Sequence, residues 1–118
     1  MVRLIDFQFD TVKKFKAIRD KFVENARELK RIASNLFKDD LYAVYVFGSV
    51  VKGKTHAMSD IDVAVVLLKP ATEYERIRLY REVRKKFGML HPFEIHVVTK
   101  DEWDSWYGKF VGEDFIEV

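Results

Sequence analysis

The chain has 118 residues, of which 48% are hydrophobic, and this suits a single domain built around one core. It contains no cysteine, which excludes disulfides, thiolate zinc sites, iron–sulfur clusters and a cysteine nucleophile. Its 21 basic and 19 acidic residues nearly balance, so bulk charge gives no reason to expect a nucleic-acid partner.

The first expected element is one long helix over about residues 11–38, with Asp10 or Thr11 as its N-cap. Its apolar residues recur every three or four positions, which is typical of a helix with one buried side. At about 1.5 Å per residue this helix would be about 40 Å long, so we expect one end to project beyond the core. The predicted buried side consists of Phe15, Ile18, Phe22, Ala26, Leu29, Ala33 and Leu36.

Two strands are expected next, over residues 41–47 and 61–68, because both segments are runs of β-branched and aromatic residues. Gly48 and Ser49 close the first strand, and a Lys-Pro pair closes the second. Between the strands we expect a turn or two of helix followed by a polar loop over residues 55–59.

Two capping boxes open the remaining helices. The box at residues 72–75 begins a helix that Gly88 ends. A third strand is expected over residues 93–98, and the second box, at residues 99–102, begins a C-terminal helix over about 100–111. The predicted buried side of the first of these helices consists of Tyr74, Ile77, Tyr80, Val83 and Phe87.

The expected order is therefore α–β–(short α)–β–α–β–α. This order predicts an α+β fold, an α/β sandwich in which helices cover at least one face of a three-stranded sheet over about residues 41–98. No linker or repeat divides the chain, so residues 1–118 are expected to form one domain. No apolar run approaches the roughly 20 residues of a membrane helix, and no signal peptide is apparent, so we expect a cytoplasmic protein with no membrane partner.

Asp60 and Asp62 stand two positions apart at the start of the second strand. Strand side chains alternate, so both carboxylates should point to one side of the sheet while Ile61 and Val63 point into a core. Two carboxylates so near to each other raise each other's pKa unless a cation neutralises their charge. Mg²⁺ suits such a pair, because it takes one or two protein carboxylates and fills its shell with water and phosphate.

Gly48 and Ser49 offer a place for that phosphate. They follow a strand and open a helical turn, where free backbone N–H groups attract anions. Gly48 has no Cβ, so a phosphate could approach the backbone closely. Lys52 and Lys54 could screen the charge of a triphosphate. The P-loop pattern G-x-x-x-x-G-K-[ST] is absent from the sequence.

A third acid, Glu94, lies on the third strand, where Phe93, Ile95 and Val97 alternate with Glu94 and His96. If the second and third strands are neighbours, three carboxylates converge. That arrangement is typical of two metal ions that clamp a displacement at phosphorus. Glu94 and His96 would share a strand face, but we expect the histidines at positions 56, 91 and 96 to be structural or exposed.

Together, Gly48-Ser49, ten further residues, Asp60-Ile61-Asp62 and a later strand acid resemble the DNA polymerase β-type nucleotidyltransferase superfamily. The size and element order are similar to those of its minimal nucleotidyltransferases. The resemblance implies a mixed sheet and the transfer of a nucleoside monophosphate from an NTP, such as ATP, to an acceptor hydroxyl. In that superfamily the third acid is usually Asp, so Glu94 is a departure that puts full activity in question.

By the same resemblance, Asp60, Asp62 and Glu94 are the catalytic residues and the ligands of two Mg²⁺ ions, for which Mn²⁺ could substitute. Glu94 would also help to deprotonate the acceptor. Gly48 and Ser49 would hold the β- and γ-phosphates. The nucleotide-binding set as a whole is Gly48, Ser49, Lys52, Lys54 and Ser59.

The resemblance also implies a partner, because minimal members often pair with a separate HEPN-type helical protein as antitoxin and toxin. Three functions stay open: an enzyme that modifies a hydroxyl on such a partner, a catalytically weak module that only binds it, and a nucleotidyltransferase for small molecules such as aminoglycosides. A homo-oligomer is possible. For the C-terminal aromatic cluster around Trp103 and Trp106, core packing and a partner surface are both open.

Overall fold

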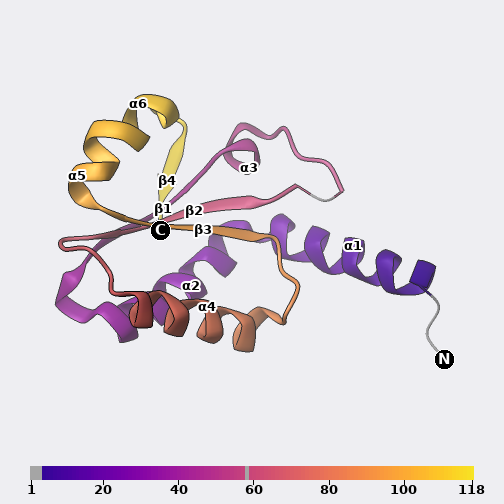
Figure 1. Cartoon of the computed structure of the whole chain (residues 1–118). Coiled ribbons are helices and arrows are strands. Elements are labelled where there is room, and N and C mark those ends of the chain that lie inside the picture. Colours follow the sequence, from indigo (N-terminus) through magenta and orange to yellow (C-terminus); the bar gives the residue numbers. More distant parts are fainter. Residues whose placement is uncertain (1–3, 58) are drawn as a thin grey trace.

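The computed structural model describes residues 4–57 and 59–118 (Figure 1). The elements follow the expected order, except that two helices replace the first one and a further strand comes at the end. In chain order they are α1 (Leu4–Asp20), α2 (Phe22–Phe37), the 3-10 turn η1 (Lys38–Asp40), β1 (Leu41–Phe47), α3 (Ser49–Lys52), β2 (Ile61–Leu67), α4 (Glu73–Phe87), β3 (Phe93–Thr99), α5 (Lys100–Glu102), the π-helical turn η2 (Trp103–Tyr107), α6 (Gly108–Val111) and β4 (Phe115–Glu117).

The strands form one mixed sheet in the order β3-β2-β1-β4. β2 pairs with β1 in antiparallel and with β3 in parallel orientation, and β4 pairs with β1 in antiparallel orientation. The expected α+β fold and mixed sheet are confirmed, but the prediction of three strands over about residues 41–98 was wrong. The fourth strand has three residues, too few for a recognisable alternating pattern, and only its pairing with residues 45–47 defines it.

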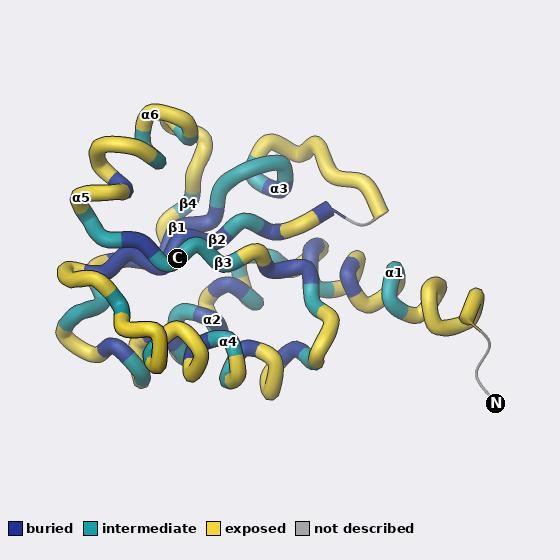
Figure 2. The backbone as a smooth tube through the Cα atoms, viewed as in Figure 1, coloured by how far each residue is buried: buried dark blue, intermediate teal, exposed yellow. Residues whose placement is uncertain are grey.

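The sheet is covered by helices on both faces, as Figures 1 and 2 show. On one face, α2 and α4 pack on alternate strand residues that include Ile61 and Val63. On the other, the segment α5–η2–α6 packs on the intervening residues through Trp103 and Tyr107. The alternation of β2 therefore sends one half of its side chains into each core.

The single long helix predicted over residues 11–38 is in fact two helices that meet at Lys21. Lys21 has φ −120° and ψ 43°, outside the helical region, and the Asn25 side chain donates to the Ile18 carbonyl across the break. The first helix also begins at Leu4, so neither Asp10 nor Thr11 is an N-cap. The predicted buried side is nonetheless confirmed, because Phe15 is buried and the other members, from Ile18 to Leu36, lie in or against the core.

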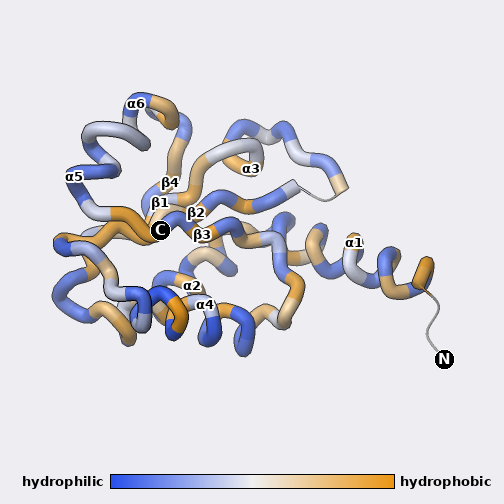
Figure 3. Tube along the Cα trace, viewed as in Figure 1, coloured by the Kyte–Doolittle hydropathy of each residue, from blue (hydrophilic) through white to orange (hydrophobic). Residues whose placement is uncertain are grey.

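The outer turns of α1 project away from the sheet, as expected for one end of this region (Figure 1). Their apolar side chains, such as Leu4 and Phe9, are exposed, and Figure 3 shows hydrophobic residues at this outer end. Within residues 4–57 and 59–118, every helix is too short or too polar to span a lipid bilayer.

The buried side predicted for α4 was partly wrong. Both capping boxes form as predicted, at Thr72 and at Thr99. However, the buried residues of α4 are Leu79, Val83 and Phe87, whereas Tyr74 and Ile77 are exposed. Both stripes satisfy helical spacing toward the C-terminal end, and only the position of α2 beside α4 selects the one that contains Leu79.

Candidate active site

The parallel pairing of β2 and β3 brings two of the three predicted acids together. Asp62 is the register partner of Glu94, and both side chains point to the face on which α5–α6 pack. Ile61 and Val63 are completely buried on the opposite face, which fixes the register and prevents β2 from turning Asp62 inward. The structure thus satisfies the condition on which convergence depended, that the second and third strands are neighbours.

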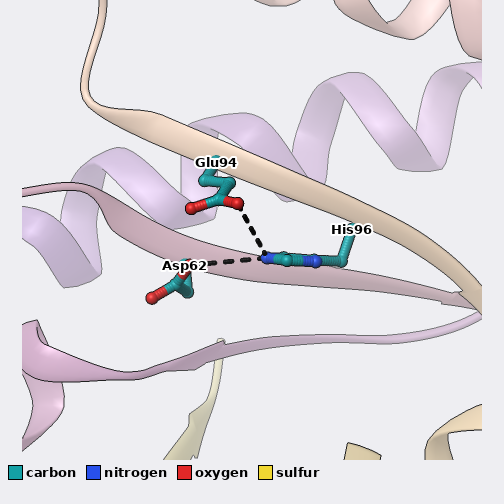
Figure 4. Close-up of side chains that lie close together, drawn as sticks. All are labelled: Asp62, Glu94 and His96. Carbon is teal, nitrogen blue, oxygen red and sulfur yellow. Dashed lines mark hydrogen bonds and ion pairs between the residues drawn. The ribbon is translucent and has the colours of Figure 1, made fainter.

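His96 completes this group from two positions further along β3 (Figure 4). Its Nε2 lies 3.4 Å from Asp62 Oδ1 and 3.9 Å from Glu94 Oε1. One donor atom from each of these three residues lies within 4.8 Å of the others. The side chains of Asp62 and His96 are each 23% exposed and that of Glu94 is 55% exposed, so the group is open to a ligand from solvent.

Gly48 forms the wall beside Asp62. Its φ of 82° and ψ of −156° lie in a region that almost only glycine adopts. A Cβ at this position would collide with Asp62 Oδ2. Gly48 therefore allows the chain to leave β1 at this angle and keeps the space next to the Asp62 carboxylate free.

The electrostatics of the site reflect its crowding. Partial burial raises the pKa of Glu94, and its interaction with Asp62 raises it further. The hydrogen-bond contact with Asp62 raises the pKa of His96, against the opposing effect of its own burial. Negative charge thus accumulates where β2 and β3 run side by side, and a cation at this place would be stabilised.

The other predicted site residues are not part of this group. Asp60 is exposed directly before β2 and is not among the three clustered donors, although its charge adds to the rise in the Glu94 pKa. Ser49 is half-buried at the start of α3, and Lys52 and Lys54 are exposed. Ser59 is buried, and its hydroxyl accepts a hydrogen bond from the His56 backbone N–H.

Arg19, which contacts the loop before Asp60, is a residue that sequence reasoning missed. It is buried at the end of α1, and its guanidinium donates to the carbonyls of Ala57 and Ser59 at 2.8 and 3.1 Å. These bonds tie the helix to the loop that leads into Asp60. Its place one turn after Phe15, on the buried side of the helix, is the signal that could have identified it.

The donor set of the site fits a divalent metal ion. Asp62 and Glu94 offer carboxylate oxygens from neighbouring strands, where backbone hydrogen bonds hold them, and Gly48 leaves space beside them. Oxygen donors of this kind are the ligands that Mg²⁺ and Mn²⁺ prefer. The same chemistry is expected from the resemblance of the sequence to nucleotidyltransferases.

Comparison with known families gives the same answer for the class of protein. The nucleotidyltransferase domain family matches the chain over residues 26–114, from α2 to the segment before β4. The chain belongs to this family, whose fold is the DNA polymerase β-like nucleotidyltransferase fold.

Individual relatives agree with this assignment. The spectinomycin 9-adenylyltransferase of Staphylococcus aureus is 28% identical over 95 residues, which cover 75% of this chain and 36% of that protein. The chain therefore spans about a third of the length of this curated relative. A crystal structure assigned as a nucleotidyltransferase is 30% identical, with a TM-score of 0.57, and the match covers 78% of this chain and 95% of that one. The toxin–antitoxin MntA–HpeT shares the fold at 17% identity and a TM-score of 0.50, over 84% of this chain and 70% of that one.

Proposed function

We propose that this protein transfers a nucleoside monophosphate, AMP from ATP, to a hydroxyl group of an acceptor and releases pyrophosphate. The observation that carries the proposal is the convergence of Asp62 and Glu94 on neighbouring parallel strands, beside the glycine that ends β1. AMP is favoured over other nucleotides because the similar curated proteins are adenylyltransferases.

Asp62 and Glu94, with Asp60 at the entry to β2, would hold the Mg²⁺ ions. When bound, such ions neutralise the charge that develops on the transferring phosphate and orient it for displacement. The site has space for these ions, because the acids lie on one face of the sheet and Gly48 adds no side chain there.

The chain's own groups would position the nucleotide and move the proton. The first backbone N–H groups of α3 and the Ser49 hydroxyl would bind the β- and γ-phosphates, and the exposed Lys52 and Lys54 would add positive charge. Glu94 would accept the proton of the acceptor hydroxyl.

For the acceptor, we propose a hydroxyl on a separate HEPN-type helical protein, with this chain acting as one cytoplasmic domain over residues 1–118. Trp106 and Phe110, 63% and 76% exposed on the site's side of the sheet, offer an apolar contact surface for a protein. The toxin–antitoxin complex that shares the fold supports the same choice. A small-molecule acceptor is the second candidate, because the spectinomycin enzyme is similar in sequence.

The direct test incubates the protein with labelled ATP, Mg²⁺ or Mn²⁺, and the protein encoded by the adjacent gene. Label should appear on that protein with the unaltered chain and should be lost in Asp62→Asn and Glu94→Gln. Asp39→Asn in η1 and Glu73→Gln in α4 make the same chemical changes at exposed acids away from the site and should keep activity. No label with the unaltered chain, or equal label with Asp62→Asn, refutes the proposal. If Glu94→Gln still binds the partner and the unaltered chain transfers nothing, the protein is a binding module.

A further inference from the structure

His96 reaches both carboxylates of the site from its own position on β3. Its Nε2 is 3.4 Å from Asp62 Oδ1 and 3.9 Å from Glu94 Oε1. Three donors within 4.8 Å of one another can share one ion after small side-chain adjustments, because two metal–ligand bonds of about 2.1 Å span about 4 Å. Asp60, which the sequence pattern would place in this group, is not one of the three.

The imidazole is held in this orientation by its neighbours. Its ring centroid lies 5.3 Å from that of Phe47 and 5.7 Å from that of Tyr107, and its side chain is 23% exposed. β3 places Glu94 and His96 two residues apart on one face, so their spacing is fixed by the strand. As Figure 4 shows, the ring presents one nitrogen toward both carboxylates.

A purely supporting role for His96 fits this geometry less well. A residue that only orients Asp62 would be expected to make one short, direct hydrogen bond, and such bonds between N–H and oxygen measure about 2.7–3.2 Å. The observed 3.4 Å is longer, and the same nitrogen also approaches Glu94. A position within reach of two carboxylates, and tightly bonded to neither, is that of a third ligand.

We propose that His96 is a direct ligand of the divalent metal, together with Asp62 and Glu94, and that its nitrogen makes the site prefer Mn²⁺ to Mg²⁺. This inference rests on the metal site of the proposed function. Mg²⁺ binds oxygen ligands and dehydrates reluctantly, whereas imidazole suits first-row transition metals. Mn²⁺ shares the carboxylate and water ligands of Mg²⁺ but is itself a first-row transition metal, and three protein ligands leave positions open for water and phosphate.

The first test detects the metal–nitrogen bond itself. Mn²⁺ alone is added to the full chain without nucleotide, and electron spin echo envelope modulation is recorded to find coupling to a directly bound nitrogen. We expect ¹⁴N coupling in the unaltered protein, replacement by ¹⁵N coupling when its histidines are ¹⁵N-labelled, and loss of the coupling in His96→Gln. His91→Gln is the matched control, because the His91 imidazole accepts a hydrogen bond from the Phe93 backbone N–H instead. The nitrogen coupling should persist in this variant.

The second test measures selectivity by calorimetric titration with Mn²⁺ and with Mg²⁺. The unaltered protein should bind Mn²⁺ at least about tenfold more tightly than Mg²⁺. Loss of even an outer partner of a ligand lowers metal affinity by about 10–100-fold, so His96→Gln should lower Mn²⁺ affinity by at least that factor. Its Mg²⁺ affinity should change much less. Circular dichroism confirms that the variant is folded, and the isotope-labelled unaltered protein gives the answer if it is not.

The outcomes separate this inference from the proposed function. Unaltered protein that shows no nitrogen coupling, or coupling that persists in His96→Gln, overturns the assignment of His96 even if labelled AMP is transferred. Nitrogen coupling that disappears in His96→Gln supports the assignment even if no acceptor is ever labelled. Equal affinities for Mn²⁺ and Mg²⁺ in the unaltered protein overturn the proposed selectivity.

Discussion

The two faces of the central sheet are built from alternate residues of the same strands, but their ends differ in chemistry. Facing α2 and α4, β2 presents Ile61, Val63 and their successors, all buried in an aliphatic core. Facing α5–α6, the same strand begins with Asp62 and becomes apolar only at Ala64. One face is apolar along its whole length, and the other is apolar at one end and charged at the other.

The helices that cover the two faces of the sheet also differ. Two helices, α2 and α4, close the first face, whereas the continuous helical stretch over 100–111, expected from the sequence, covers the second and leaves Asp62 partly open. Trp103 stacks on Tyr45 with ring centroids 4.7 Å apart and closes the inner part, and Trp106 remains exposed. The difference teaches that β2 separates stability from chemistry by alternation alone, since one residue step changes the face.

Exchanging the chemistry of neighbouring β2 positions should give the largest effect. Val63→Asp would bury an unpaired carboxylate among aliphatic side chains, at a cost of several kcal/mol against a typical total stability of about 5–15 kcal/mol. We expect this variant not to fold, as measured by circular dichroism. Asp62→Val should fold, with no loss of thermal stability, and should lose nucleotide transfer. If Asp62→Val also fails to fold, the two faces do not divide their roles in this way.

The buried side of α4 can be tested by two truncations. Leu79→Ala removes a completely buried side chain and should lower the free energy of unfolding by about 2–5 kcal/mol. Ile77→Ala, two residues away and 48% exposed, should change it by no more than about 0.5 kcal/mol. Denaturant titration measures both. Similar losses of unfolding free energy in the two variants would contradict the assignment of Leu79, and not Ile77, to the buried side of α4.

Gly48 ends β1 beside Asp62, and its substitution should affect both stability and metal binding. Gly48→Ala combines a positive φ, which costs about 1–3 kcal/mol, with a collision against the Asp62 carboxylate. Gly112→Ala is a matched control, because its φ of 62° is also positive but a Cβ there meets nothing within 4 Å. Both variants should lose stability in thermal unfolding, and only Gly48→Ala should also lose affinity for Mn²⁺ in calorimetry. Equal Mn²⁺ affinities would show that Gly48 does not protect the site.

Two histidines near the opposite faces of the sheet should have pKa values shifted in opposite directions, and this is the smallest of the expected effects. The contact with Asp62 raises the pKa of His96 above the usual value of about 6.5, whereas burial, aided by Arg84 and Lys14, lowers that of His91. The His96 contribution to stability is therefore complete below about pH 6.5 and lost as pH rises through its higher folded pKa. The His91 contribution has the reverse sign and is lost as pH falls through its lower folded pKa. Imidazole resonances in a metal-free NMR titration measure both values, and the order His91 above His96 would contradict the site's electrostatics.

Much of this architecture could be predicted from local patterns. The expected bounds of the first strand were correct at 41–47, and both capping boxes form, because such signals depend on residues adjacent in sequence. The strand β4 could not be predicted, since only its pairing with the distant β1 defines it. The break at Lys21 has no glycine or proline beside it to signal the end of a helix. Among site residues, the pairing of Asp62 with Glu94 was anticipated, and the participation of His96 was not.

The amino-acid sequence by itself determined which residues could alternate to opposite sides of a strand, and hence that Asp62 must leave the core that Ile61 and Val63 enter. Only the tertiary structure decided which of the available acids meet. Asp60 precedes the strand and lies outside the group of three donors, whereas His96 is carried into that group because β3 lies parallel to β2 in one register. The physical reason is that alternation is a local property of the backbone, while register is set by the packing of whole strands and helices.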